Sequence, residues 1–255
     1  MSAHTLFVSD LHLDASRPQA THAFIDFLAN DAIGADALYV LGDLFEAWLG
    51  DDDDSPLGAA VARALHALSA RGTAVHFQRG NRDFLLGTDY ALRCGMRLLP
   101  DPCVIALYGV PTLLSHGDLL CSDDIAYQQF RQRVRAPEWQ TAFLAQPLAE
   151  RAAFAAQARA ASHAHQQGID ETITDVNPGT VNAWFARFGI RRMIHGHTHR
   201  PAIHVPASDP GAWQRIVLGD WYRQGSVLRV AADGEASLRC LPFAGITLTG
   251  SSAAV

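Results

Sequence analysis

The sequence contains carboxylate, imidazole and amide side chains that each follow a short apolar run. Together these groups suit borderline and hard divalent metal ions such as Mn, Fe, Zn, Ni or Co. One ion cannot use all of them, but two ions about 3.5–4 Å apart can, provided that one carboxylate lends an oxygen to each. The candidate ligands are Asp10, His12, Asp43, Asn81, His116, His197 and His199, with Asp43 as the candidate bridge.

Asp43 shows the local sequence pattern that the candidate ligands share. It follows Ala37–Leu41, an apolar run with the length and composition of a β-strand, and Gly42 frees the backbone between them. Gly-Asp is also a common turn dipeptide, so Asp43 alone proves nothing. The same pattern recurs at the other ligands, and alternation along an extended chain puts Asp10 and His12 on one side.

Apolar runs alternate with helical patterns in the first half of the chain, which predicts an α/β fold with parallel strands and helical crossovers. In such sheets ligands bind outside the carboxyl ends of the strands, where every candidate ligand lies. Strands are predicted near residues 5–9, 37–41, 74–78, 104–107, 112–115, 193–194, 216–220 and 226–230, the last two closing a sheet, and helices over residues 20–30 and 61–68.

Residues from Cys121 to Val176 break this alternation, because they are rich in Ala and Gln and contain no strand-like run. We expect helices here, packed over the strand ends. Ordinary amphipathic helices that bury an apolar face are the default interpretation. The alternative, suggested by Trp139, Phe143 and Phe154, is a lid that offers apolar surface to a greasy substrate.

Composition limits the classes of function. The chain has 255 residues, 49% hydrophobic and 18% charged, as expected for a globular protein of one α/β domain or two smaller ones. A net charge of −6 argues against nucleic-acid binding by charge. The scattered cysteines predict small buried residues in a reducing compartment. Residues 1–13 lack a signal-peptide h-region and no run of about 18 apolar residues occurs, which predicts a cytosolic protein without a transmembrane helix.

The order of these ligand motifs from residue 10 to residue 199 resembles that of the calcineurin-like metallophosphoesterases. The resemblance implies a two-sheet α/β sandwich flanked by helices, with residues 1–255 as a single domain and a helical lid insertion at about 121–176. It also implies two divalent ions, most often manganese. By position, Asp10, His12 and His199 would hold one ion, Asn81, His116 and His197 the other, and Asp43 both.

Two positions depart from the common pattern of this family. Glu46 stands where a second Asp is frequent, and Arg82 stands where many members have a His that helps protonate a departing alkoxide. Arginine cannot act as an acid near neutral pH because its pKa exceeds about 12, but it can neutralise charge that develops on phosphoryl oxygens. Arg82 therefore suits a leaving group that needs no proton, such as a phosphate whose second pKa is about 6. This favours cleavage of a pyrophosphate over a simple ester.

Longer motifs narrow the resemblance. Gly42–Trp48, Gly80–Gly87 and His195–Pro201 are similar to the UDP-2,3-diacylglucosamine diphosphatases of lipid A biosynthesis, over nearly the whole chain. That family hydrolyses the pyrophosphate of a lipid-linked sugar nucleotide through attack of metal-activated water on the α phosphorus, giving UMP and 2,3-diacylglucosamine 1-phosphate. The resemblance implies a cytoplasmic protein in peripheral contact with the bacterial inner membrane. We expect neither a nucleic acid nor an obligate protein partner.

The narrower resemblance also implies functional residues. Those implied in catalysis are Asp43, Asn81, Arg82 and His116, and those implied in substrate binding are Asn81, Arg82, Asp124, Arg159, Ser162, Gln166 and His197. Gln166 replaces a frequent Asn and Ile169 a usual Lys, which would remove one cation from the substrate site. Two alternatives remain, a related phosphodiesterase of soluble nucleotides and a metal-free scaffold of the same fold. Arg82 and the long helical segment argue against the first, and the intact ligand set argues against the second.

Overall fold

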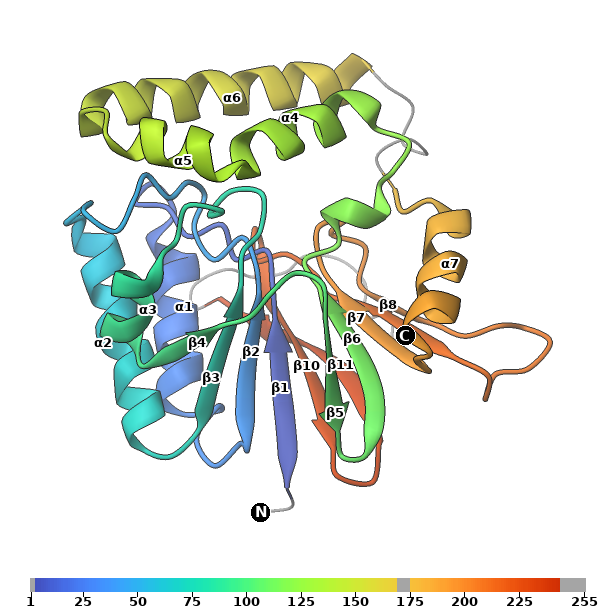
Figure 1. Cartoon of the computed structure of the whole chain (residues 1–255). Coiled ribbons are helices and arrows are strands. Elements are labelled where there is room, and N and C mark those ends of the chain that lie inside the picture. The colour runs from blue at the N-terminus through green and yellow to red at the C-terminus, as the bar shows by residue number, and fades with distance from the viewer. Residues whose placement is uncertain (1–2, 169–174, 244–255) are drawn as a thin grey trace.

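The computed structural model describes residues 3–168 and 175–243, and it contains two β-sheets packed face to face between helices (Figure 1). The first sheet has the strand order β11-β10-β1-β2-β3-β4. Its strands β1 to β4 are parallel, whereas β10 and β11 are antiparallel to their neighbours. The bounds are His4–Val8 for β1, Ala37–Leu41 for β2, Ala74–Gln78 for β3, Met96–Leu98 for β4, Gln224–Ala231 for β10 and Ala236–Pro242 for β11.

The second sheet has the order β5-β6-β7-β9-β8. Its central strands β6, β7 and β9 are parallel, and the edge strands β5 and β8 are antiparallel to their neighbours. The bounds are Cys103–Leu107 for β5, Val110–Ser115 for β6, Arg192–His195 for β7, Ala202–His204 for β8 and Gln214–Val217 for β9.

Alternation along the strands divides the apolar side chains among the layers. In β1, Phe7 belongs to the core between the two sheets, whereas Leu6 and Val8 belong to the core beneath the helices of the first sheet. In β7, Ile194 lies between the sheets and Met193 packs toward the helix on the second sheet. Both sheets are therefore covered on both faces, which rigidly fixes the ends of their central strands.

Helices cover the outer face of each sheet. On the first sheet these are α1 (Pro18–Ala29), α2 (Pro56–Ala70) and α3 (Thr88–Cys94), and on the second it is α7 (Pro178–Phe188). Proline in the first turn starts α1, α2 and α7, because the nitrogen of proline needs no acceptor there.

Three further helices, α4 (Ile125–Arg135), α5 (Pro137–Leu144) and α6 (Leu148–Gly168), form a layer across the top of the view in Figure 1. This helical layer lies over the carboxyl ends of the parallel strands. A short 3-10 helix, Asp118–Leu120, leads from β6 toward it. No described helix of the chain is long and apolar enough to cross a membrane.

The predicted sandwich is confirmed, and β2 and β3 have the predicted bounds. One expectation about the last strands is wrong. The strands predicted near 216–220 and 226–230 do not close one sheet, because β9 pairs with β7 in the second sheet and β10 pairs with β1 in the first. The sequence pattern also did not predict β4, β8, β11, α3 or α7.

Candidate metal centre

The candidate ligands lie just beyond the carboxyl ends of parallel strands from both sheets. They are Asp10 and His12 after β1, Asp43 after β2, Asn81 after β3, His116 after β6, and His197 and His199 after β7. Three of these strands belong to the first sheet and two to the second. Because the strand ends point to the same side of the molecule, beneath the helical layer, side chains from the two sheets meet there (Figure 1).

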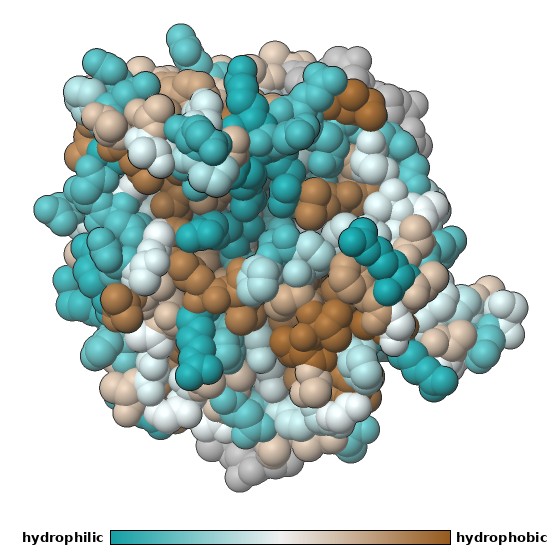
Figure 2. Space-filling view, in the orientation of Figure 1, coloured by the Kyte–Doolittle hydropathy of each residue, from teal (hydrophilic) through white to brown (hydrophobic). Residues whose placement is uncertain are grey.

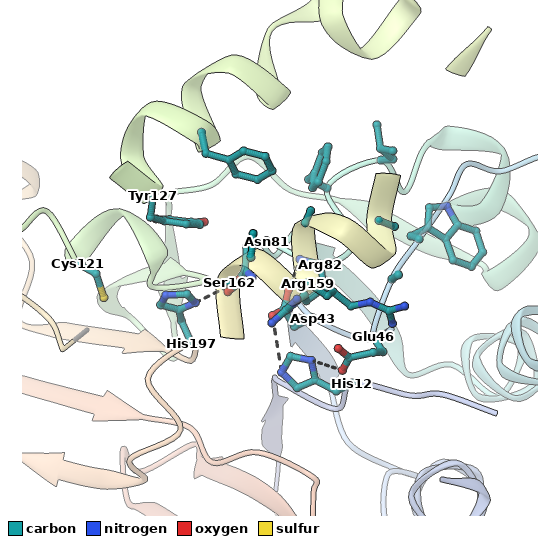
Figure 3. Close-up of a pocket in the computed structure, with 18 of the residues that line it drawn as sticks. His12, Asp43, Glu46, Asn81, Arg82, Cys121, Tyr127, Arg159, Ser162 and His197 are labelled. Atoms are coloured by element: carbon teal, nitrogen blue, oxygen red, sulfur yellow. Dashed lines mark hydrogen bonds and ion pairs between the residues drawn. The ribbon is translucent and has the colours of Figure 1, made fainter. Parts of the chain in front are cut away.

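Asp10, His12 and His199 form the first cluster. Nε2 of His199 lies 3.3 Å from Oδ1 of Asp10 and 3.3 Å from Nε2 of His12. The remaining side of this triangle, between His12 and Asp10, measures 4.0 Å. Atoms that share an ion at about 2.1 Å lie roughly 3–3.5 Å apart, so the triangle approaches the size of a metal site. Oε2 of Glu46 lies 3.2 Å from Nδ1 of His12, which leaves Nε2 toward the cluster (Figure 3).

Asn81, His116 and His197 form the second cluster. Oδ1 of Asn81 lies 2.8 Å from Nε2 of His116 and 3.0 Å from Nδ1 of His197. Nδ1 of His116 donates to the carbonyl oxygen of Leu41 at 2.9 Å. A neutral imidazole held in this way keeps the lone pair on Nε2, the atom that faces the cluster.

Asp43 connects the two clusters. Its Oδ2 lies 3.7 Å from Nε2 of His12 and 3.7 Å from Nε2 of His116. Its Oδ1 accepts a hydrogen bond from the backbone N–H of Arg82 at 2.8 Å. One oxygen therefore faces both clusters while the other fixes the orientation of the carboxylate, and this is the arrangement that a bridging ligand requires.

Backbone strain is concentrated at the same residues. Asp10, His12, Asp43, His197 and His199 have φ angles between 48° and 69°. This left-handed region costs a residue with a Cβ atom about 1–2 kcal/mol. Such strain persists only where surrounding contacts over-determine the conformation, and it tends to cluster at functional sites. The fold thus holds these ligands in place at a cost to its own stability.

Asp83 and two glycines bring two ligand-bearing loops together. Gly42 has a φ of +85°, and a Cβ atom on it would lie 2.6 Å from Cα of Gly80. The buried Asp83 carboxylate accepts hydrogen bonds from the backbone N–H groups of Gly80, Asp43 and Leu44 at 2.8, 3.2 and 2.7 Å. Burial and the neighbouring charge of Asp43 raise the pKa of Asp83 to about 6. Asp83 therefore links the loops that follow β2 and β3.

Charges within the centre set the protonation of its histidines in the metal-free protein. Burial alone would lower the pKa of His116, but nearby carboxylates, chiefly Asp43 and Asp10, raise it to about 9. For His197, burial and the charge of His116 lower the pKa to about 4. Near neutral pH, His116 is therefore a cation and His197 is neutral.

Metal binding is expected to displace the proton from His116. A divalent ion needs the neutral imidazole, so loading at pH 7 should release at least about one proton per protein, and the release should shrink as pH rises through about 9. Calorimetric titration of metal-free protein with Mn²⁺ in two buffers of different ionisation enthalpy measures this number. His116→Gln is the control and should release about one proton fewer; equal release by both proteins would contradict the assignment.

A cavity of about 600 Å³ opens beside the centre and extends beneath the helical layer (Figure 3). Most of the candidate ligands line it. Aromatic side chains from each of α4, α5 and α6 also line it, namely Phe130, Phe143 and Phe154, together with Phe84 from the loop after β3. The cavity therefore joins a polar, acidic centre to an apolar chamber.

Arg82 lines this cavity with one side-chain donor unpaired. Its backbone is fixed, because the N–H group holds Asp43 and the carbonyl oxygen accepts from the N–H of Trp48 at 3.2 Å. Its Nε is buried and has no hydrogen-bond partner among the described residues. A buried donor without a partner is costly, and here a ligand oxygen in the cavity could satisfy it.

Of the other residues implied in substrate binding, three line the cavity and one has a side chain outside the described residues. Asp124, Arg159 and Ser162 line the same cavity. Asp124 also caps α4, since its carboxylate accepts a hydrogen bond at 2.9 Å from a backbone N–H in the first turn. The side chain of Gln166 and the whole of Ile169 lie outside the described residues, so their roles stay predictions.

The sequence pattern does not single out Asp83 or Tyr222, although both face the ligands. The ring of Tyr222 is stacked on that of His12, with centroids 5.1 Å apart. One signal was available for Tyr222, because it follows Asp220 at the end of a predicted strand. The candidate ligands were selected by the same position, just after the end of a predicted strand.

The donor set fits divalent metal ions. Oδ1 of Asp10 is buried and receives no well-aligned hydrogen bond from the described residues. A buried charged oxygen without such a partner is costly, and an ion in the first cluster would satisfy it. Mixed carboxylate, amide and imidazole ligands are those that borderline divalent metals accept.

The chain is similar to several known proteins. Residues 3–201 match the model of the calcineurin-like phosphoesterase family. Two similar proteins are both named UDP-2,3-diacylglucosamine hydrolase. The one from Xanthomonas campestris pv. campestris (strain B100) is 60% identical over 91% of this chain and 97% of its own. The one from Stenotrophomonas maltophilia (strain K279a) is 62% identical over 90% and 96%. A solved structure of an archaeal phosphodiesterase covers 93% of this chain and 99% of its own at 10% identity, with a TM-score of 0.49.

Proposed function

Because the chain belongs to the calcineurin-like phosphoesterase family, we propose that it hydrolyses the pyrophosphate bond of UDP-2,3-diacylglucosamine and releases UMP and 2,3-diacylglucosamine 1-phosphate. The names of the two bacterial relatives specify this substrate. The observation that carries the proposal is a single cavity that contains both the candidate metal centre and an aromatic chamber. This combination suits a substrate that joins a pyrophosphate to acyl chains.

Two divalent ions, with Mn²⁺ as the proposed metal, would occupy the two clusters. The first would be held by Asp10, His12 and His199, the second by Asn81, His116 and His197, and both by Asp43. Such ions act as Lewis acids and lower the pKa of bound water toward neutrality.

The chain's own donors would bind the pyrophosphate and its developing charge. Asn81 turns its Oδ1 toward the second cluster, so its Nδ2 group would donate to a phosphoryl oxygen. The Arg82 guanidinium has a buried donor available in the same cavity. Both groups stabilise charge that spreads over the phosphoryl oxygens. After attack at the α phosphorus, the departing sugar phosphate needs no proton, because its second pKa is about 6.

In this proposal the helical layer α4–α6 is a lid over the metal centre, inserted at about residues 121–176 of a single domain. The rings of Trp139, Phe143 and Phe154 pack together with centroids 4.6–5.6 Å apart, and the last two line the cavity. Buried Arg151 of α6 pairs with Asp52 in the loop after β2. These contacts support a chamber that keeps acyl chains away from water.

Contact with the cytoplasmic face of the inner membrane is also part of the proposal, because a diacylated substrate resides in a bilayer. The helices α4, α5 and α6 expose Ile125, Leu144 and Leu148, at 61, 39 and 38%. Figure 2 shows apolar residues, in brown, among hydrophilic ones, in teal, at the top of the view, where the helical layer lies. Apolar side chains of this kind can enter the interface between headgroups and acyl chains.

Hydrolysis in ¹⁸O-labelled water tests the proposed function. With Mn²⁺ and UDP-2,3-diacylglucosamine in vesicles, the label is expected in UMP, which locates the attack at the α phosphorus. UDP-N-acetylglucosamine has the same pyrophosphate without the two long chains, and it should be cleaved at least about 100-fold more slowly, since acyl burial contributes about 0.8 kcal/mol per CH₂. Equal rates would favour a phosphodiesterase of soluble nucleotides, and no turnover from vesicles would contradict membrane contact.

A further inference from the structure

The loop Asp220–Tyr222, which follows β9, contacts every residue of the first cluster. The backbone N–H of Trp221 donates to the carbonyl oxygen of Asp10 at 3.0 Å. Oδ2 of Asp220 lies 3.9 Å from Nδ1 of His199. The loop is itself fixed, because the N–H of Tyr222 donates to Oδ1 of Asp220 at 2.9 Å. A segment that provides none of the proposed ligands thus lies against this cluster.

Tyr222 contacts both imidazoles of the cluster with one ring. The ring lies nearly parallel to that of His12, at 11° with centroids 5.1 Å apart. It is also 5.6 Å from the ring of His199, at 57°. Contacts of this size restrict the rotation of an imidazole about its side-chain bonds. They can therefore hold Nε2 of His12 toward the place where an ion would bind.

Arg17 links the ring of Tyr222 to the backbone of His12. Its guanidinium donates a hydrogen bond to the carbonyl oxygen of His12. The guanidinium carbon lies over the Tyr222 ring, 4.7 Å from the centroid, in a cation–π contact. His12 has a φ of 48°, a strained conformation that needs external contacts to persist. Arg17 and Tyr222 supply such contacts to its backbone and its side chain, respectively.

We propose that Tyr222, supported by Arg17, is a positioning residue that orients His12 and sets the affinity of the first metal position while leaving the second unchanged. This inference rests on the metal centre of the proposed function. Groups that only orient a metal ligand typically contribute 10- to 100-fold in metal affinity. The second cluster is held instead by other contacts, among them the bond from His116 to Leu41.

Calorimetric titration of metal-free protein with Mn²⁺ alone tests the inference without an activity assay. The wild-type protein should bind two ions. Tyr222→Ala should weaken one of them by about 10- to 100-fold, while Tyr222→Phe, which keeps the stacked ring, should stay within about threefold. Arg17→Met should weaken the same ion. Tyr222 is solvent-exposed, at 43%, so removal of its side chain should leave the metal-free thermal melt nearly unchanged.

Two background variants identify which ion is affected. In His116→Ala, which damages the second cluster, adding Tyr222→Ala should further weaken the remaining ion. In His12→Ala the same addition should have a much smaller effect, because the ring has lost the imidazole on which it stacks and keeps only its contact with His199. Weakening of both ions together, no weakening, or an equal loss in Tyr222→Phe would overturn the inference. A wild-type protein that binds no Mn²⁺ would instead contradict the metal centre of the proposed function.

Discussion

Replacing Asp43 by asparagine is expected to leave a folded protein that has lost affinity for both metal ions. Oδ2 of Asp43 faces the two clusters at equal distances of 3.7 Å, while Oδ1 accepts from the backbone N–H of Arg82. An asparagine amide must turn its oxygen toward that N–H, because an amide nitrogen there would meet another donor. Its NH₂ group would then face the ions, and this group has no lone pair to offer them.

The loss of Mn²⁺ affinity in Asp43→Asn should exceed the loss caused by replacing any other single candidate ligand. Both affinities for Mn²⁺ should fall by more than about 100-fold, beyond the effect of groups that only orient a ligand, and UMP release should fall with them. His12→Ala and His116→Ala should each affect one ion first. Asp14→Asn is the matched control, because the Asp14 carboxylate accepts hydrogen bonds only from Ser16 among the described residues. An Asp43→Asn protein that binds two ions with unchanged affinity would rule out the bridge.

The strands that present the ligands are visible in the sequence because both of their faces are covered. A strand buried between helices and a second sheet must be a nearly continuous apolar run, and β2, at Ala37–Leu41, is such a run. Its carboxyl end then follows directly from where the run stops. This is why residues at strand ends could be chosen before any contact between them was known.

Edge strands and short helices lack a continuous apolar run that would mark them in the sequence. All residues of β8 are half-buried, and those of β11 are half-buried or exposed, so pairing with β9 and β10 holds them in place. The helix α3 begins where Asp51, from a distant loop, accepts hydrogen bonds from the N–H groups of Gly87 and Tyr90. Asp51 therefore caps this helix from a loop 36 residues away in the sequence.

The residues that cluster in the candidate centre could be chosen from the sequence, but the residues that support them could not. Ligand types are recognisable by their chemistry at strand ends, whereas Tyr222 acquires a role only when the loop after β9 lies against His12, some two hundred residues away. Asp83 likewise matters because two loops converge on its carboxylate. Such roles arise from long-range packing, which a local sequence pattern does not specify.

Arg82→Ala is expected to lower kcat for UDP-2,3-diacylglucosamine by about 100- to 1,000-fold while both metal ions still bind. This range is typical for the loss of one preorganised donor to developing charge on oxygen. Metal binding should survive, because Arg82 supports Asp43 through a backbone N–H that alanine retains. Its buried Nε has no described protein partner to lose. Steady-state kinetics and Mn²⁺ titration measure the two effects separately.

Arg82→Lys and Arg82→His distinguish charge stabilisation from proton donation. Lysine keeps the charge without the planar fork, so it should recover only part of the rate. Histidine supplies an acid that a phosphate leaving group does not need, so Arg82→His should stay well below the wild-type rate on the pyrophosphate. On a phosphodiester with an alkyl leaving group, Arg82→His should be more active than the wild type, because the departing alkoxide requires a proton. Full pyrophosphate cleavage by Arg82→His would show that an acid can replace the arginine, and the link between Arg82 and the leaving group would fail even if the metal centre were intact.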